Sequence, residues 1–175
     1  SLAENHHHNG ILSHSIVPAP KSLDLQPVAQ DYITRLLNHL NYVGVLTLEL
    51  FVTDKGLFAN EMAPRVHNSG HWSIEGAVCS QFENHIRAVA GLPLGSTDVI
   101  RPSVMVNIIG QHPKTEDILA LNGAHLHLYN KAEREGRKIG HITLLPNDSI
   151  ELTRLCRQLA KILPQPLALT QDMNI

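Results

Sequence analysis

Two glutamates on either side of a short turn are the residues whose spacing first suggests chemistry. Glu49 and Glu61 lie in apolar runs, within residues 43–62, that are separated by residues 53–56, a pattern typical of a β-hairpin. With residues 54–56 as a three-residue loop, the register places Glu49 directly opposite Glu61. Opposed side chains have Cβ atoms roughly 4.5–5.5 Å apart, and like charges there are destabilising. Two such carboxylates therefore share either a proton or a cation. Mg²⁺ suits this place because it takes one or two carboxylates and completes its shell with phosphates and water.

The alternative for the same hairpin is a two-residue turn. That turn slips the register by one residue, separates the two carboxylates and leaves them on an exposed edge. The hairpin alone does not decide between a metal-binding pair and two solvated glutamates.

The segment that follows the hairpin, residues 62–72, is rich in polar groups. It reads Met-Ala-Pro-Arg-Val-His-Asn-Ser-Gly-His-Trp, in which proline and glycine prevent a regular element. A loop with a guanidinium and many donors, placed at the end of a strand beside a metal pair, is a natural site for an anion or a substrate. The alternative is an ordinary capped loop, with His67 and His71 as surface residues or as a chance pair of metal ligands.

These two segments resemble the ATP-grasp enzymes, and within them the 5-(carboxyamino)imidazole ribonucleotide synthases of purine biosynthesis. The resemblance is carried by Leu-Glu-Leu-Phe at residues 48–51 and by Asn-Glu-Met-Ala-Pro-Arg-Val-His-Asn-Ser-Gly-His-Trp at residues 60–72. Other ATP-grasp carboxylases usually have Glu-x-Asn where this chain has Glu61-Met62-Ala63. Further matching segments are residues 4–7, 81–83, 91–94, 102–105, 125–129 and 136–141.

The resemblance implies an ATP and magnesium site. Glu49 and Glu61 correspond to the family's magnesium-binding glutamates. Asn60 and Glu61 correspond to residues at the nucleotide phosphates, and His7 matches a histidine of the ATP site. ATP and Mg²⁺ are therefore the expected cofactors.

The resemblance also implies residues for the other two substrates. Arg65 and His67 lie where the family handles carboxyphosphate, which is derived from bicarbonate, and the aminoimidazole. Lys131, Arg137 and Lys138 match basic residues that hold the ribonucleotide 5′-phosphate, a role for which cations and nearby glycine amides are suited. Without the resemblance, residues 131–138 would be interpreted as a solvated, charge-rich turn.

The activity implied is the ATP-dependent carboxylation of 5-aminoimidazole ribonucleotide with bicarbonate, which releases ADP and phosphate. Arg65 is expected to hold the anion and His67 to take up the amine proton, because an imidazole titrates near the working pH. Members of the family are considerably longer, so the chain is expected to be a fragment that is inactive alone. The resemblance further implies a homodimer for the full-length enzyme. The alternatives are a non-catalytic nucleotide-binding or subunit-association module and a different ATP-grasp ligase.

The elements that must position these residues follow from hydrophobic spacing. No regular element is expected before a strand at residues 11–17. A helix from about Pro27 to Asn41 has apolar residues at spacings of three and four, which predicts one buried face. A second helix is expected over residues 73–90. Its apolar stripe consists of Ile74, Val78, Phe82, Ile86 and Val89.

The remainder of the chain is expected to be β-rich. Candidate strands are residues 103–109, 125–129 and 138–144, and a last helix starts at Asp148, where Glu151 completes a capping box. The predicted fold class is α+β. Residues 1–95 are expected to form the C-terminal part of an ATP-grasp domain, residues 96–165 a small β-rich C-terminal domain, and residues 166–175 a tail.

Composition restricts the partners. The chain has 175 residues, 14 basic against 16 acidic side chains, and a formal charge of −2, which argues against nucleic acid or an anionic membrane surface bound by bulk charge. No apolar run approaches the ~20 residues of a membrane span. The two cysteines, Cys79 and Cys156, form no disulfide framework, and a location in the reducing cytoplasm is therefore expected.

Overall fold

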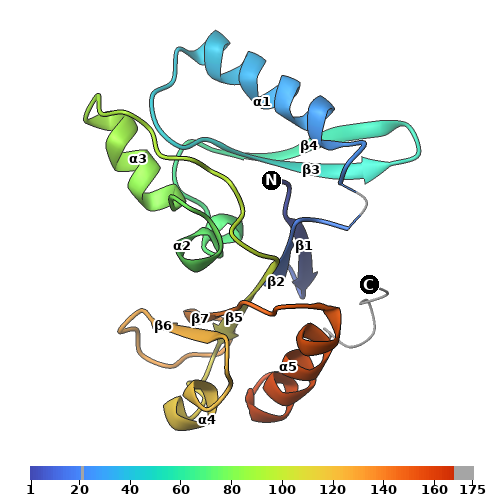
Figure 1. Ribbon diagram of the computed structural model, residues 1–175, viewed down its shortest axis with the longest axis vertical. Coiled ribbons are helices and arrows are strands. Elements are labelled where there is room, and N and C mark those ends of the chain that lie inside the picture. Colours follow the sequence, from blue (N-terminus) through green and yellow to red (C-terminus); the bar gives the residue numbers. More distant parts are fainter. Residues whose placement is uncertain (21, 168–175) are drawn as a thin grey trace.

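Two antiparallel sheets organise the chain. The computed structural model describes residues 1–20 and 22–167. The larger sheet has five strands in the order β1-β2-β5-β7-β6, and the smaller is the hairpin β3–β4 (Figure 1). The strands are β1 (Glu4–His8), β2 (Ile11–Val17), β3 (Thr47–Thr53), β4 (Gly56–Ala63), β5 (Ser103–Ile109), β6 (Ala124–Leu128) and β7 (Lys138–Leu144). The predicted α+β class is confirmed.

Three of the helices lie toward the two ends of the molecule, and α2 and α3 lie between them (Figure 1). In Figure 1 the hairpin and α1 occupy one end, α4 and α5 occupy the other, and β1–β2 run between them. The helices are α1 (Gln26–Leu40), the 3₁₀ turn η1 (Asn68–Gly70), α2 (Ser73–Gly76), α3 (Gln81–Val89), α4 (Thr115–Leu119) and α5 (Ser149–Ile162).

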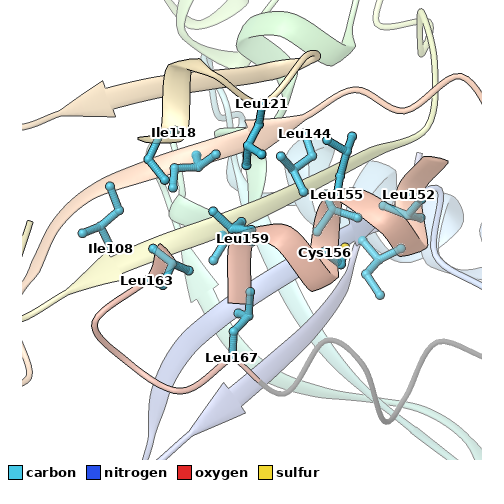
Figure 2. Close-up of a cluster of buried hydrophobic side chains, with 14 of the residues drawn as sticks. Ile108, Ile118, Leu121, Leu144, Leu152, Leu155, Cys156, Leu159, Leu163 and Leu167 are labelled. Atoms are coloured by element: carbon cyan, nitrogen blue, oxygen red, sulfur yellow. The ribbon is translucent and has the colours of Figure 1, made fainter. Parts of the chain in front are cut away.

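The main hydrophobic core lies between α5 and one face of the large sheet. Leu152, Leu155, Cys156 and Leu159 of α5 are buried against residues of β5 and β7 (Figure 2). Asp148 caps α5 by accepting a hydrogen bond from the Glu151 N–H at 2.7 Å. The Glu151 carboxylate accepts from the Asn147 N–H, one residue before the cap. The strands at 103–109 and 138–144 and this helix form where hydrophobic spacing predicts them. Both strands are buried on both faces, and α5 is buried on one.

The N-terminal elements differ from expectation in two ways. Residues 4–8 form β1, which pairs with β2, although no element was expected there. Helix α1 forms and ends at Asn41 in the left-handed conformation, as predicted. Its predicted buried face is wrong, because only Ala29 is buried, and Val28 and Tyr32 are exposed. Hydrophobic spacing identifies a face, whereas its burial depends on what packs against it.

The single helix predicted over residues 73–90 is wrong. The chain forms α2 and α3 with an extended break, in which Ala77 makes a β-bridge to Val99. Ser80 then begins α3 by accepting a hydrogen bond from the Glu83 N–H at 3.1 Å. The Ser-x-x-Glu pattern is a helix start, and here it overrides the helical spacing across it. The predicted apolar stripe is mostly exposed, at Ile74, Val78, Ile86 and Val89.

The large sheet crosses the predicted domain boundary at residues 95–96. Strand β2 lies before this boundary and β5 after it, yet they pair directly, with Ser15 opposite Met105. The domain limits remain a prediction. Leu167, which falls in the predicted tail, is buried in the α5 core, and residues 168–175 of that tail lie outside the described residues. In the described part of the chain, none of the helices combines the length and apolarity that crossing a membrane requires.

Candidate active site

The hairpin places Glu49 opposite Glu61, although by a different route from the one expected. The turn has two residues, since Thr53 pairs with Gly56, and this alone would slip the register. A β-bulge at Asn60 inserts one extra residue in β4 and restores the register, so that Glu49 pairs with Glu61. Bulges of this kind are common next to functional sites. The expected three-residue loop is therefore wrong and the predicted pairing of the two glutamates is confirmed.

The two carboxylates and Asn60 form an oxygen-rich group. The Asn60 amide donates to Glu49 Oε2 at 3.3 Å, and Glu61 takes part in none of the ion pairs formed among described residues. Within residues 1–20 and 22–167, no three His, Cys, Asp or Glu side chains gather closely enough to hold a metal by themselves. Two paired carboxylates are a ligand set of the kind that Mg²⁺ uses, because this ion takes few protein carboxylates and fills its shell with phosphate and water.

His67 is held in place from both its backbone and its ring. The Gln81 side chain accepts from the His67 N–H at 3.0 Å and donates to the His67 carbonyl at 2.7 Å. The ring Nδ1 lies 2.8 Å from the Ser69 hydroxyl and accepts from the Ser69 N–H at 3.3 Å. Nε2 lies 3.8 Å from Glu49 Oε1, and both of these side chains are 13% exposed. Gly70 permits this arrangement, because a Cβ there would lie 2.5 Å from Gln81 Oε1.

Charged groups of both signs surround the His67 ring. Desolvation is the main cause that lowers the pKa of His67 below 6.5; Glu49 and Glu61 oppose the shift, and Arg65 and Lys138 add to it. The pKa of Lys138 is lowered by its own desolvation, by Lys131 and by Arg65, against the two glutamates. The carboxylate pair, Arg65, His67 and Lys138 therefore lie within electrostatic reach of one another. The sequence alone does not show this proximity, because Lys138 is on β7, about 70 residues after His67.

A pair of side-chain amides connects the His67 loop to the large sheet. Asn68 and Asn107 donate to each other, at 3.0 and 2.6 Å, and Asn107 also donates to the Leu12 carbonyl at 2.8 Å. Lys138 Nζ donates to Asn68 Oδ1 at 3.4 Å. Asn107 is fully buried. Its amide therefore holds Asn68, the residue after His67, against β5. Strand β5 pairs with β7, which carries Lys138.

A second connection between the loop and the sheet consists of imidazoles, which the sequence analysis did not identify. His141 stacks on His127 at 4.4 Å between ring centroids and meets His71 edge-on at 5.2 Å. His127 is paired with Glu75 at 2.6 Å, and His141 Nδ1 lies 2.7 Å from the Tyr129 hydroxyl. Burial lowers the pKa of His71 to about 4 and that of His141 to about 3. Alternation along residues 125–129 predicts that His127 and Tyr129 share one face, whereas His141 joins them through the strand pairing, in which it lies opposite His127.

The other predicted residues are placed less centrally. Lys131 Nζ lies 5.2 Å from the centre of the Tyr129 ring and within electrostatic reach of Lys138. Arg137 turns away, since it donates to the Ala132 carbonyl at 3.4 Å, and among the described residues it makes no hydrogen bond or ion pair with another predicted site residue. His7 is exposed on β1. It lines a cleft of about 780 Å³ together with Glu49 and Asn60.

Comparison with known proteins identifies the families to which the two parts of the chain are similar. The ATP-grasp domain family matches residues 1–82, and the family described as phosphoribosylaminoimidazole carboxylase C-terminal domain matches residues 103–154. The N5-carboxyaminoimidazole ribonucleotide synthase of Pseudomonas aeruginosa is 57% identical over 143 residues, which is 82% of this chain and 39% of that protein.

Two solved structures share the fold. The N5-carboxyaminoimidazole ribonucleotide synthetase of Thermus thermophilus has a TM-score of 0.90 and 52% identity, covering 93% of this chain and 46% of that one. The Aspergillus clavatus enzyme, solved in complex with ADP and 5-aminoimidazole ribonucleotide, has a TM-score of 0.83 and 34% identity over 91% of this chain and 46% of that one. The chain thus spans less than half the length of each of these relatives.

Proposed function

Because the chain belongs to the N5-carboxyaminoimidazole ribonucleotide synthase family of ATP-grasp enzymes, we propose that it supplies one side of an active site for ATP-dependent carboxylation of 5-aminoimidazole ribonucleotide. The observation that carries the proposal is the gathering of Glu49, Glu61, Arg65 and Lys138 around His67. Two carboxylates and two cations at one place suit a reaction whose substrates include a nucleotide, a carboxylated anion and a sugar phosphate.

The carboxylates have the nucleotide role in this proposal. Glu49 and Glu61 would hold Mg²⁺, which when bound neutralises charge on the ATP phosphates. Asn60 holds Glu49 in place through its amide and stands beside Glu61 on the bulge, where it would face the same phosphates. His7 lines the same cleft and is the proposed contact with ATP on β1.

The basic side chains are proposed to bind the anionic groups of the other two substrates. Bicarbonate becomes an electrophile only when phosphorylation turns one oxygen into a leaving group, and Arg65 would hold the resulting carboxyphosphate. Lys138 and Lys131 would hold the ribonucleotide phosphate, a proposal that their mutual proximity supports. Arg137 is proposed to bind the same phosphate, because it matches a phosphate-binding residue of the family. Its guanidinium would have to turn from the Ala132 carbonyl toward the ligand.

The proposal concerns the whole enzyme that contains this chain. Phosphoryl transfer depends on positioning and charge stabilisation from several sides, and the relatives have more than half of their length outside the matched part. We therefore expect the 175-residue chain alone to show no turnover. A homodimer and a cytoplasmic location belong to the same proposal. The two cysteines are free and buried, as suits a reducing compartment.

The test is Glu61→Gln in the complete enzyme, measured as ADP release that requires both bicarbonate and the ribonucleotide. The change removes a metal-binding charge without altering shape, and we expect turnover to fall by about 10²-fold, because metal charge stabilisation is worth several kcal/mol. The control is Glu116→Gln on α4, which is exposed and far from the hairpin (Figure 1). Unchanged turnover in Glu61→Gln at limiting Mg²⁺ would refute the metal role. Nucleotide binding without any turnover in the complete protein would favour the non-catalytic module.

A further inference from the structure

The His67 ring has two nitrogens in different surroundings, and this difference bears on its chemistry. Nδ1 faces its own loop, where it meets the buried Ser69. Nε2 faces the carboxylate pair and lies 3.8 Å from Glu49 Oε1. Because one nitrogen points inward and the other outward, the location of the ring proton determines whether the site receives an N–H donor or a free lone pair.

The Ser69 backbone determines where that proton resides. A backbone N–H is always a donor, and the Ser69 N–H points at His67 Nδ1 at 3.3 Å. The Ser69 hydroxyl lies 2.8 Å from the same nitrogen and can rotate to donate to it as well. A proton on Nδ1 would set two N–H groups against each other. Nδ1 is therefore an acceptor, and the neutral ring carries its proton on Nε2.

The ring is held against a flip about its Cβ–Cγ bond, which would put Cδ2 in the place of Nδ1. The Gln81 side chain forms hydrogen bonds with the N–H and the carbonyl of His67 and so holds the backbone from which the ring projects. His71 Nδ1 lies 2.9 Å from the same carbonyl, to which it can donate. A flip would also leave the Ser69 N–H without Nδ1 as its acceptor. This hydrogen bond caps the start of the 3₁₀ turn η1. The Nε2 position is thus preorganised, as an effective donor to a developing anion should be.

We propose that His67 serves as a fixed N–H donor, through Nε2, to an anionic oxygen of a carboxylate- or phosphate-bearing substrate, and that Ser69 is the residue that positions it. This inference rests on the function proposed above. It replaces the expectation that His67 takes up the amine proton, because the nitrogen that faces the site already carries a proton. Arg65 and Lys138 provide charge at the same place, and His67 adds a directed hydrogen bond.

The first experiment reads the proton directly. Two-dimensional ¹⁵N–¹H spectra of the histidine rings in the 175-residue protein at pH 8 distinguish Nδ1–H from Nε2–H, and His67→Gln identifies the His67 signals by their loss. We expect the proton on Nε2. We expect it to remain there in Ser69→Ala, which keeps the backbone N–H. A His67 signal with the proton on Nδ1 would overturn the proposal, whether or not the enzyme is active.

The second experiment compares two replacements of His67 in the complete enzyme. Glutamine can place an amide N–H near the position of Nε2 but cannot act as a base, whereas asparagine is too short to reach it. We expect His67→Gln to stay within about 10-fold of wild-type turnover and His67→Asn to lose about 10²–10³-fold, the usual effect of removing such a donor. Equal losses of about 10²–10⁴-fold in both would indicate a base and overturn the proposal. Equal thermal unfolding of the two variants is the control for folding.

Discussion

Acid should destabilise this protein through the imidazoles that join the His67 loop to the large sheet. Burial lowers the pKa of His71 to about 4 and of His141 to about 3, from 6.5 for an exposed imidazole. Above pH 6.5 both rings are neutral in the folded and the unfolded chain, so they do not affect stability there. Below pH 6.5 the unfolded chain binds protons that the folded chain excludes. The free energy of unfolding therefore falls as the pH drops from 6.5 toward 4.

The size of this effect follows from the difference between the working pH and 6.5, the pKa of an exposed imidazole. At pH 5 each ring is protonated in the unfolded chain and neutral in the folded chain, and 1.5 pH units at about 1.36 kcal/mol per unit give about 2 kcal/mol for each. The two rings together lower the free energy of unfolding by about 4 kcal/mol relative to pH 7.5. This is a large fraction of the total of about 5–15 kcal/mol that is typical of a domain.

Urea denaturation at pH 7.5 and pH 5 measures this difference. His141→Asn removes one ionisable ring and keeps an acceptor for the Tyr129 hydroxyl, so the drop attributed to these rings should shrink from about 4 to about 2 kcal/mol. The control is His39→Asn at the exposed end of α1, which should leave the drop unchanged. If His141→Asn loses as much stability between the two pH values as the wild type, the reasoning from burial is refuted.

Two further predictions concern the loop and the phosphate site. Gly70→Ala should lower the free energy of unfolding by about 1–3 kcal/mol, because the new Cβ meets the Gln81 amide; most of this loss should disappear in a Gln81→Ala background, and a loss that persists would contradict the cause. Lys138→Met in the complete enzyme should raise KM for the ribonucleotide by about 10–100-fold, as loss of a charge-assisted contact of about 1.5–3 kcal/mol implies, and leave KM for ATP within a few-fold. Lys55→Met at the exposed hairpin turn is its control, and an equal rise in both KM values would reassign Lys138.

The sequence predicted the elements that pack into the hydrophobic core and failed where the structure depends on distant contacts. Strand β2 and helix α5 formed at their predicted positions. The break between α2 and α3 depends on the bridge from Ala77 to Val99, which no local pattern reveals.

The candidate site shows the same limit. The pairing of Glu49 with Glu61 was predicted correctly, but the bulge at Asn60 that produces it was not, since a bulge leaves no spacing signal distinct from a longer turn. The residues of the His67 loop could be identified by resemblance, whereas their attachment to Asn107 and His141 required the fold. Those partners lie on strands far along the chain and reach the loop only when β5 and β7 join β2 in one sheet.

The pairing of β2 with β5 has a consequence for attempts to build hybrid enzymes. A chimera joined at residues 95–96 would combine the N-terminal segment of one homologue with the C-terminal segment of another. The junction lies in an irregular stretch and looks permissive. Yet the seam between the parents would run through the middle of the five-stranded sheet, where Ser15 faces Met105 and Ile16 faces Val104. It would also separate Asn68 from Asn107. To keep both sides of this seam from one parent, a chimera would have to take β1 and β2 together with β5 to β7 from that parent. These strands come from two non-contiguous pieces of chain.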